Sequence, residues 1–519
     1  MTLIDNLALG FREALTVQNL FYCFLGVTVG NFMGVIPGVG AVAAVSILLP
    51  VTYYVPATAG LIMLAGLYYG AVYGAVTGAI LLNIPHTVSA VECLDGYPMA
   101  QQGRAGVALF MTTIASLCGS LAGVVILALF APPVAEFALQ FGSPEYFSLI
   151  ILGMTGAAAL AKGSPARSFI MVVLGMILGI VGIDVNSGQP RFTYGFTHLS
   201  DGVNVGIIAM GLFGVAELMA SAGKPKPVLL DSKSITWRSL LPTRDDWRRS
   251  WPAILRGVGV GSCFGILPGG GAVLASIMGY TVEKQIARNP SRFGKGAIEG
   301  VVAPEAAANA ACQTSFVPTL TLGIPTDPIM AVMLAALIMK GISPGPSLIA
   351  QHADVFWGLV ASFIIGNVLL VIWHIPLIRV WVRLLTIPFH MLYPAVLVMI
   401  CMGVYSIHSS EIDVMLLLGF GCVGYVMRRL DFQPAPLLVG LVLGPLMEEH
   451  LRRSLIVSRG NLAIFVEKPI SAIVLAVSLV VMVFMLRGGR SPAKLTVLAS
   501  PDDGERAVRR FDAPTDGSA

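Results

Sequence analysis

Two glycine- and proline-rich phrases interrupt apolar stretches of the chain. Residues 34–42 read GVIPGVGAV and residues 265–273 read GILPGGGAV, an offset of 231 positions (265 minus 34). A helix broken inside a membrane exposes free N–H groups at one end and free carbonyls at the other, and the N–H end favours anions. Glycine also lets a ligand approach the backbone closely. Two such breaks could therefore hold a carboxylate without a buried Arg or Lys.

A second break follows each phrase. YGAVYGAVTGAILLNIP ends at Pro85 and NAACQTSFVPTLTLGIP ends at Pro325, an offset of 240 positions (325 minus 85). Interrupted hydrophobic segments at corresponding positions of two repeats are the best sequence indication of a transporter's binding site. The sequence therefore predicts an internal duplication, with the substrate or ion site at the breaks.

Asp327, in GIPTDP, is the strongest single candidate for a functional residue. Burying a carboxylate beside a break in a membrane segment costs free energy, so such a residue is by default functional. We expect it to help bind a coupling cation or proton. The structural alternative is that Thr326 or Asp327 caps a helix that begins at Pro328. His86 follows the other Ile-Pro pair, where it could relay protons or be a satisfied polar residue at a helix end.

Further polar groups precede the second Ile-Pro pair. Their amides and hydroxyls could coordinate a cation, bind the substrate, or only form hydrogen bonds between helices. These residues are Asn309, Gln313, Thr314 and Ser315. Tyr68, Tyr69 and Tyr73 occupy the corresponding stretch of the first half, where aromatic packing is the favoured interpretation. Glu305 could face the site or cap a helix after Pro304, and both alternatives stay open.

The composition predicts a polytopic membrane protein. Of 519 residues, 56% are hydrophobic and 12% charged, against about 25% charged in soluble domains. Apolar runs near the roughly 18–20 residues that span a bilayer are 107–130, 203–222, 354–378, 385–404 and 470–486. They are apolar all round rather than alternating as barrel strands do, so we expect helices. The charge pattern does not indicate nucleic-acid binding, and the seven cysteines, without CxxC pairs, indicate neither disulfides nor a zinc site.

The predicted organisation has five parts. They are an amphipathic segment (1–19), a first transmembrane repeat (20–222), a basic linker (223–251), a second transmembrane repeat (252–486) and a polar, disordered tail (487–519). The positive-inside rule makes the linker cytoplasmic, together with the stretches 95–106, 162–167 and KQIARNPSRFGK. The basic stretch 448–468 does not fit the positive-inside rule, because the number of predicted helices places it outside.

The predicted fold is an all-α polytopic membrane protein with about 10–12 transmembrane helices. An odd number of crossings separates the two glycine-rich phrases, which inverts the second repeat relative to the first. Each repeat is expected to contain a Gly/Pro-broken re-entrant hairpin or discontinuous helix. Such inverted pairs suit alternating access.

The residues also resemble a known family. GVIPGVGAVAAVSILLPVTY, YYGAVYG, DGYPMAQQGRAG, FGKGAIEGVVAPEAAANAA, LTLGIP and KGISPGP together are similar to the large membrane permease subunit of tripartite tricarboxylate transporters, the TctA family, from about residue 10 to 486. The resemblance implies a multi-pass permease of the bacterial inner membrane that imports an organic anion by symport with Na⁺ or H⁺. It also implies two partners, a small four-helix membrane subunit and a periplasmic solute-binding receptor, and no cofactor.

The resemblance assigns site residues by motif. The family's glycine-rich loops match Gly38, Gly40, Gly269, Gly270 and Gly271, and its proline breaks match Asn83 with Pro85, and Pro325. The chain departs from the family pattern at three places. His86 stands where the family often has Gly, Thr326-Asp327 stand where it has Gly and a small residue, and Ala308-Asn309 replace an Asn-Asn pair. These departures bear on the substrate and coupling ion, not on the fold.

Other functions are weaker hypotheses. An enzyme needs a nucleophile and base, and the sequence contains no HExxH or Walker A motif. GVGAVA (38–43) matches a loose dinucleotide pattern but lacks the acidic residue about 20 positions on. A stand-alone ion-coupled carboxylate symporter and a channel remain as alternatives. The sequence does not identify the carboxylate.

Overall fold

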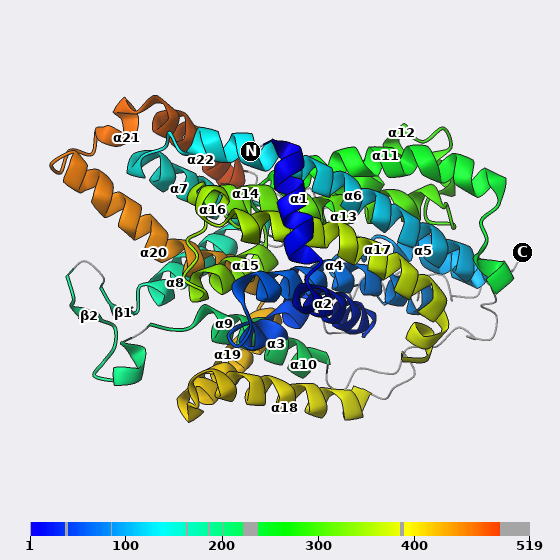
Figure 1. Ribbon diagram of the computed structural model, residues 1–519, viewed down its shortest axis with the longest axis horizontal. Helices are drawn as coiled ribbons and strands as arrows, with labels where there is room; N and C mark the ends of the chain where they lie inside the picture. The colour runs from blue at the N-terminus through cyan, green and yellow to red at the C-terminus, as the bar shows by residue number, and fades with distance from the viewer. Residues whose placement is uncertain are drawn as a thin grey trace, which may run out of the picture.

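The computed structural model describes residues 2–36, 40–84, 86–161, 164–184, 187–200, 202–221, 237–384 and 389–487. Helices dominate these ranges (Figure 1). The exception is a short antiparallel pair, β1 (Gly182–Ile183) and β2 (Pro190–Arg191), in which Gly182 pairs with Arg191. The expected all-α membrane architecture is confirmed.

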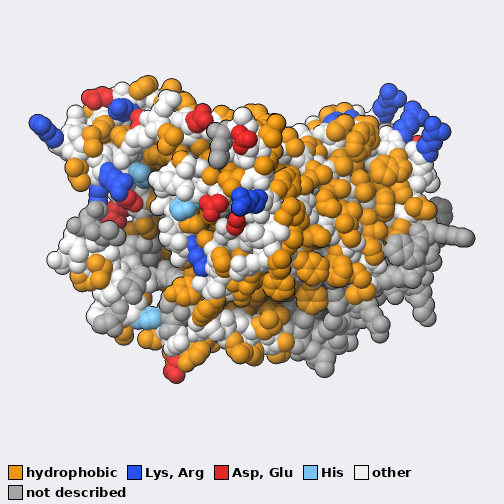
Figure 2. All heavy atoms as spheres, in the orientation of Figure 1, with side chains coloured by type: hydrophobic (Ala, Val, Ile, Leu, Met, Phe, Trp, Pro, Cys, Tyr) orange, Lys and Arg blue, Asp and Glu red, His pale blue; other side chains and the backbone are white. Residues whose placement is uncertain are grey.

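Three helical stretches of the described chain are long and apolar enough to cross a membrane: Ala57–Leu82, Cys93–Ala138 and Ala353–Leu377. Six shorter apolar helices accompany them. Figure 2 shows hydrophobic side chains gathered over the centre right of the visible face, with charged groups at the left, at the centre and at the upper right corner. The figure of 10–12 crossings stays a prediction.

The first unit consists of three helices, α2 (Val17–Val35), α3 (Ala41–Thr52) and α4 (Ala57–Leu82). Helix α2 lies directly against α4 because glycines line the contact. A Cβ atom added at Gly26, Gly30 or Gly34 would lie 2.3, 2.5 or 2.1 Å from a backbone carbonyl oxygen of α4. Those oxygens belong to Met63, Leu67 and Ala71. Only glycine permits this approach.

The second unit repeats this construction with α11 (Arg244–Ile266), α12 (Gly271–Ile286), α13 (Glu299–Thr314) and α14 (Phe316–Leu322). Added Cβ atoms at Gly257 and Gly261 would lie 2.3 and 2.1 Å from the carbonyl oxygens of Ala303 and Ala307. These glycines stand 231 positions after Gly26 and Gly30, and their partners stand 240 positions after Met63 and Leu67. The repeated sequence phrases therefore correspond to repeated helix packing, while the inversion of one unit stays a prediction.

The other helices surround these units. They are α1 (Leu3–Ala14), α5 (Cys93–Met99), α6 (Ala105–Ala138), α7 (Ser143–Leu160), α8 (Pro165–Gly179), α9 (Val205–Ala209), α10 (Ala216–Ser221), α15 (Pro328–Met339), α16 (Ser347–Gln351), α17 (Ala353–Leu384), α18 (Phe389–His408), α19 (Glu411–Arg429), α20 (Pro434–Val457), α21 (Ile464–Glu467) and α22 (Pro469–Arg487). Short π- and 3₁₀-turns cover Ala100–Arg104, Thr197–Leu199, Met210–Val215, Trp237–Leu240 and Pro290–Arg292.

Three segments predicted to be cytoplasmic meet at one end of the molecule. The Asp95 carboxylate accepts hydrogen bonds from the backbone N–H groups of Gly294, Gly296 and Ala297, at 2.9, 2.9 and 2.8 Å. Arg104 forms a salt bridge with Asp246 in the first turn of α11. Burial would raise the pKa of Asp246, but hydrogen bonds from Arg104 and Thr243 outweigh it and hold that pKa below its usual value. Residues 95–106, 237–251 and 284–295 thus share one side.

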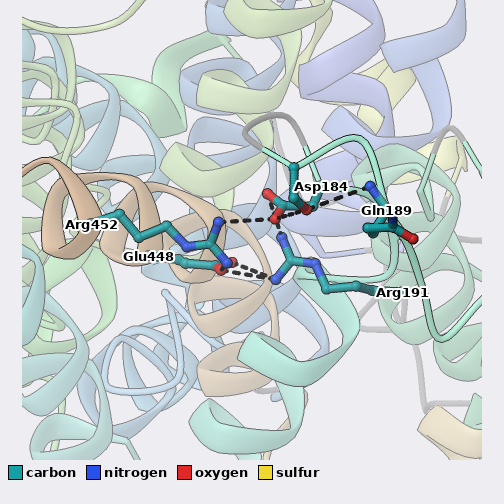
Figure 3. Close-up of polar contacts among 6 residues, drawn as sticks. Asp184, Gln189, Arg191, Glu448 and Arg452 are labelled. Atoms are coloured by element: carbon teal, nitrogen blue, oxygen red, sulfur yellow. Dashed lines mark hydrogen bonds and ion pairs between the residues drawn. The ribbon is translucent and has the colours of Figure 1, made fainter. Parts of the chain in front are cut away.

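The basic stretch 448–468 lies at the opposite end, beside the β1–β2 hairpin (Figure 1). Figure 3 shows Arg452 of α20 and Arg191 between Asp184 and Glu448. Both arginines lie 2.9 Å from an Asp184 oxygen. Arg191 lies 2.8 Å from the Glu448 carboxylate, and Arg452 lies 2.6 Å from it. Acidic partners thus pair with both arginines at this end. The stretch stays an exception to the positive-inside rule, which counts Lys and Arg and gives acidic residues little weight.

One expected boundary was wrong. Helix α8 ends at Gly179, because the chain turns into the β1–β2 hairpin, so the expected helix 168–184 is shorter. Helix α11 begins at Arg244, within the expected linker 223–251, because Thr243 and Asp246 form a capping box there. The extent of the linker stays a prediction. Residues 223–236 of the linker and the tail from residue 488 lie outside the described residues.

Candidate functional site

The two breaks of the second unit touch each other. We call residues 267–270 its glycine turn and residues 323–327 its Ile-Pro break. The Gly269 N–H donates to the Thr326 carbonyl oxygen at 2.8 Å. A Cβ atom added at Gly271, the first residue of α12, would lie 2.9 Å from the Asp327 Cβ atom. Gly269 and Gly271 both have positive φ, +79° and +54°, which other residues adopt only with strain.

Asp327 is the N-cap of α15, which confirms the helix-capping geometry considered for it. One carboxylate oxygen accepts from the Met330 N–H at 2.9 Å. The other accepts from the Tyr68 hydroxyl at 3.0 Å, so a residue of the first unit reaches the break of the second. Within the described residues, Asp327 forms no ion pair with Lys, Arg or His. Capping and cation binding are compatible, and the latter stays a prediction.

The corresponding place in the first unit contains a small cavity. It has a volume of about 10 Å³, close to the lower limit for one water molecule. Its lining includes Gly40, the N-cap residue of α3, together with His86 and Thr87. An added Cβ at Gly40 would lie 3.8 Å from the Thr87 hydroxyl oxygen. By the 231 and 240 offsets, Gly40 and Thr87 correspond to Gly271 and Asp327.

His86 is not a satisfied residue at a helix end. Its side chain is 7% exposed, and its Nε2 atom has no hydrogen-bond partner in the described structure. The neighbouring Gly78 leaves room for the ring, since an added Cβ there would lie 3.2 Å from Nε2. A buried imidazole nitrogen without a partner can accept or donate to a ligand that enters the cavity.

Four other predicted residues are placed at turns. Asn83 is the C-cap of α4 in the left-handed conformation, with φ of 53°. Gly270 is the N-cap residue of α12, and Pro325 lies buried in the Ile-Pro break. Thr326 is also buried, and its hydroxyl has no partner within the described residues. Gly38 and Pro85 lie outside the described residues.

The polar residues around the end of α13 separate into two groups. The hydroxyls of Thr314 and Ser315 donate to carbonyl oxygens one turn back, at 3.1 and 2.7 Å, so the helix itself satisfies them. Asn309 donates to the Glu305 carboxylate at 2.8 Å. Gln313 is fully buried, and neither amide atom has a partner among the described residues. Asn309 and Gln313 are therefore the polar groups still available to a ligand.

Sequence reasoning missed the role of Tyr68 and did not single out Glu92. Tyr69 and Tyr73 pack edge-on against Phe363 and His374, as the aromatic-packing interpretation predicts, but Tyr68 donates to Asp327. The capping alternative for Glu305 was wrong, because α13 begins at Glu299 and runs through Pro304. Glu305 is instead buried inside the helix bundle.

Comparison with known proteins adds independent information. A model of the tripartite tricarboxylate transporter TctA family matches residues 20–439. An Agrobacterium vitis protein, described as an uncharacterised 52.8 kDa protein in the TAR-I ttuC' 3' region, is 48% identical over 487 residues, which cover 94% of this chain and 97% of the relative. A second protein of that organism, described as an uncharacterised protein in the TAR-II ttuC' 3' region, is 53% identical over 226 residues, 44% of this chain and 93% of the relative. No solved structure matches the chain.

Proposed function

Because the chain belongs to the tripartite tricarboxylate transporter TctA family, we propose that it is a permease that imports an organic carboxylate by symport with Na⁺ or H⁺. Membership makes it a membrane subunit of a tripartite transporter. The partners in our proposal are a small four-helix membrane subunit and a periplasmic receptor, and the location is a bacterial inner membrane. The carboxylate is a tricarboxylate, a dicarboxylate or a related anion.

The observation that carries this proposal is the contact between a glycine turn and an Ile-Pro break, made with the same offsets in two units. In the second unit Gly271 lies against Asp327, and in the first Gly40 lies beside Thr87. Each glycine stands at the N-terminus of a helix, α12 or α3, where the helix dipole favours negative charge. The arrangement supports anion binding through backbone N–H groups.

The second unit has a carboxylate, Asp327, at the position where the first unit has Thr87, and this difference supports coupling between cation binding and anion binding. A substrate carboxylate near Asp327 would be repelled as long as Asp327 is ionised and unpaired. A cation or proton bound at Asp327 removes this repulsion, so the anion and the cation bind together. Thr87 brings no charge to the first unit, so the cavity beside Gly40 and His86 suits the carboxylate. The cavity is smaller than any such substrate, and transport therefore requires the first unit to open.

An uptake experiment tests the proposal. The permease is reconstituted with its two partner subunits in proteoliposomes, and labelled tricarboxylates and dicarboxylates are offered under an imposed Na⁺ or pH gradient. We expect accumulation that collapses when the gradient is removed. Uptake that is the same with and without an imposed gradient would contradict symport. Ion currents without accumulation of the carboxylate would favour a channel. Equal uptake by the permease alone would favour the stand-alone symporter.

The variant Asp327→Asn isolates the coupling role. Because Asn is also a good N-cap residue, we expect the variant to fold normally and to lose the response to the cation gradient. A hydrogen bond to a charged group contributes about 1.5–3 kcal/mol. Loss of the Asp327 charge should therefore raise the cation concentration for half-maximal uptake about 10- to 100-fold. Asp354→Asn, which changes an exposed carboxylate at the start of α17, is the matched control. An unchanged cation response in Asp327→Asn would reduce Asp327 to a helix cap.

A further inference from the structure

A second polar cluster lies apart from the breaks. Its centre is a pair of carboxyl groups, Glu92 just before α5 and Glu305 in α13, which are 0% and 1% exposed. Ser116 of α6, Ser276 of α12 and Asn309 of α13 surround them. Helices α6, α12 and α13 therefore all contribute to one buried polar group inside an otherwise apolar body.

The hydrogen bonds to this pair come only from neutral donors. Glu305 Oε1 accepts from the Ser116 hydroxyl and from the Asn309 amide, the latter at 2.8 Å. Glu92 Oε1 accepts from the Ser276 hydroxyl at 3.2 Å. Neither carboxyl group forms an ion pair with a Lys, Arg or His of the described chain. Helix α12, whose Ser276 binds Glu92, packs against α13 beside Glu305, since a Cβ atom added at Gly279 would lie 3.2 Å from the Pro304 Cα atom.

Two oxygens of the cluster have no partner. Glu92 Oε2 and Asn309 Oδ1 both lack a hydrogen bond in the described structure, although both side chains are completely buried. An ionised carboxylate buried without a cation is very costly, and such groups usually neutralise instead. Two carboxylates that share a site cannot easily both ionise. A bound proton removes one charge and converts an acceptor oxygen into a donor.

We infer that Glu92 and Glu305 form a proton-binding site, with at least one proton held by the pair in the conformation described here. A metal ion fits the cluster less well, since the described residues contain no group of three or more His, Cys, Asp or Glu side chains placed to hold one. The titratable groups that interact with the pair are Tyr73 on α4, Cys93 on α5 and Cys312 on α13. Tyrosine and cysteine are neutral near pH 7, so none of them supplies a balancing charge.

The use of this proton in transport rests on the proposed function, whereas its binding does not. Ser276, which donates to Glu92, lies on α12, and the first residue of α12 is Gly271, which faces Asp327. Loss of the proton would leave two repelling carboxylates between α12 and α13. The same helix therefore connects the charge on the pair with the break at which the cation is proposed to bind.

Infrared spectroscopy of the full-length protein in an alkyl-maltoside detergent, which has no carbonyl group of its own, tests the inference without substrate or gradient. A protonated carboxyl group gives a carbonyl-stretch band that a carboxylate lacks. We expect this band near pH 7 in the wild-type protein and in Glu136→Gln, a control at an exposed position of α6. The band should disappear at high pH. It should be lost in the double variant Glu92→Gln/Glu305→Gln, in which neutral amides replace both carboxyl groups.

Two results would overturn the inference. One is a spectrum in which the wild type and the double variant Glu92→Gln/Glu305→Gln show the same band at every pH. The other is loss of the band on adding Na⁺ at constant pH, which would make the pair a metal site. Ser116→Ala keeps both carboxyl groups and should shift the band rather than remove it, so it serves if a Gln variant fails to fold. The infrared experiment measures no transport. A negative infrared result would therefore not contradict the proposed symport, and absence of symport in the uptake experiment would not contradict proton binding by the pair.

Discussion

At the scale of single residues, the hydrogen bond from Tyr68 to Asp327 joins the two units. Tyr68→Phe removes only the hydroxyl and keeps the buried ring in α4. Because a hydrogen bond to a charged group contributes about 1.5–3 kcal/mol, we expect its loss to shift the cation concentration for half-maximal uptake about tenfold or more. The measurement is uptake by the reconstituted transporter as a function of cation concentration.

Tyr69→Phe provides the matched control for this variant. Tyr69 is the next residue on the same helix and is equally buried, but its hydroxyl has no hydrogen-bond partner in the described structure. Its replacement should leave the cation dependence unchanged. An equal shift in both variants would show that the effect comes from packing of α4 rather than from the hydroxyl beside Asp327.

The sequence identifies Asp327 but not its partner, for a physical reason. A carboxylate in an apolar stretch is conspicuous because it is costly there. Tyr68 and Tyr69 are neighbours of the same type, and they point about 100° apart on a helix. Which of them faces Asp327 depends on how α4 lies against the second unit, and no local pattern contains that information. Glu92 escaped notice because it precedes the charged stretch 95–106 and resembles a solvated loop residue.

At the scale of secondary-structure elements, the glycine stripes of α2 and α11 are the repeated device that brings each pair of helices together. The duplicated phrases can be read in the sequence. The glycine stripes, Gly26, Gly30 and Gly34 on α2 and Gly257 and Gly261 on α11, are recognised only from the contacts between helices in the structure. The offsets of the phrases and of the packing partners agree, at 231 and 240 positions. Element boundaries were less predictable, because a capping box starts α11 early and a hairpin ends α8 early.

Gly30→Ala and Gly261→Ala test the stripes in both units. The added methyl groups would lie 2.5 and 2.1 Å from the carbonyl oxygens of Leu67 and Ala307, so the helices must separate. We expect each substitution to cost about 1–3 kcal/mol of stability, as for other overpacked positions. The measurement is thermal unfolding of the purified protein in detergent, together with uptake activity.

Gly259→Ala is the control, because it lies on the exposed face of α11 and an added Cβ there meets no atom within 4 Å. Alanine is intrinsically the better helix former by about 1 kcal/mol, so this variant should be neutral or stabilised. Equal destabilisation by Gly259→Ala and Gly261→Ala would mean that backbone flexibility, rather than close helix approach, explains the glycines.

At the scale of the whole molecule, polar ends flank an apolar body. The segments 95–106, 237–251 and 284–295 come together at one end, whereas the β1–β2 hairpin and the end of α20 form the other (Figure 1). The positive-inside rule predicted the first grouping from charge alone. The basic stretch 448–468 does not follow the rule, and its Arg452 forms ion pairs with Asp184 and Glu448.

These two ends should lie on opposite sides of the membrane. We expect a membrane-impermeant maleimide to label Arg453→Cys and Tyr194→Cys, both at exposed positions of the hairpin end, from outside intact cells whose outer membrane has been permeabilised. Arg288→Cys, exposed after α12, should react only in inverted vesicles. The background is a variant with the seven native cysteines replaced and uptake retained. Labelling of all three from one side would overturn the predicted orientation, because helices that span the apolar body must separate its polar ends.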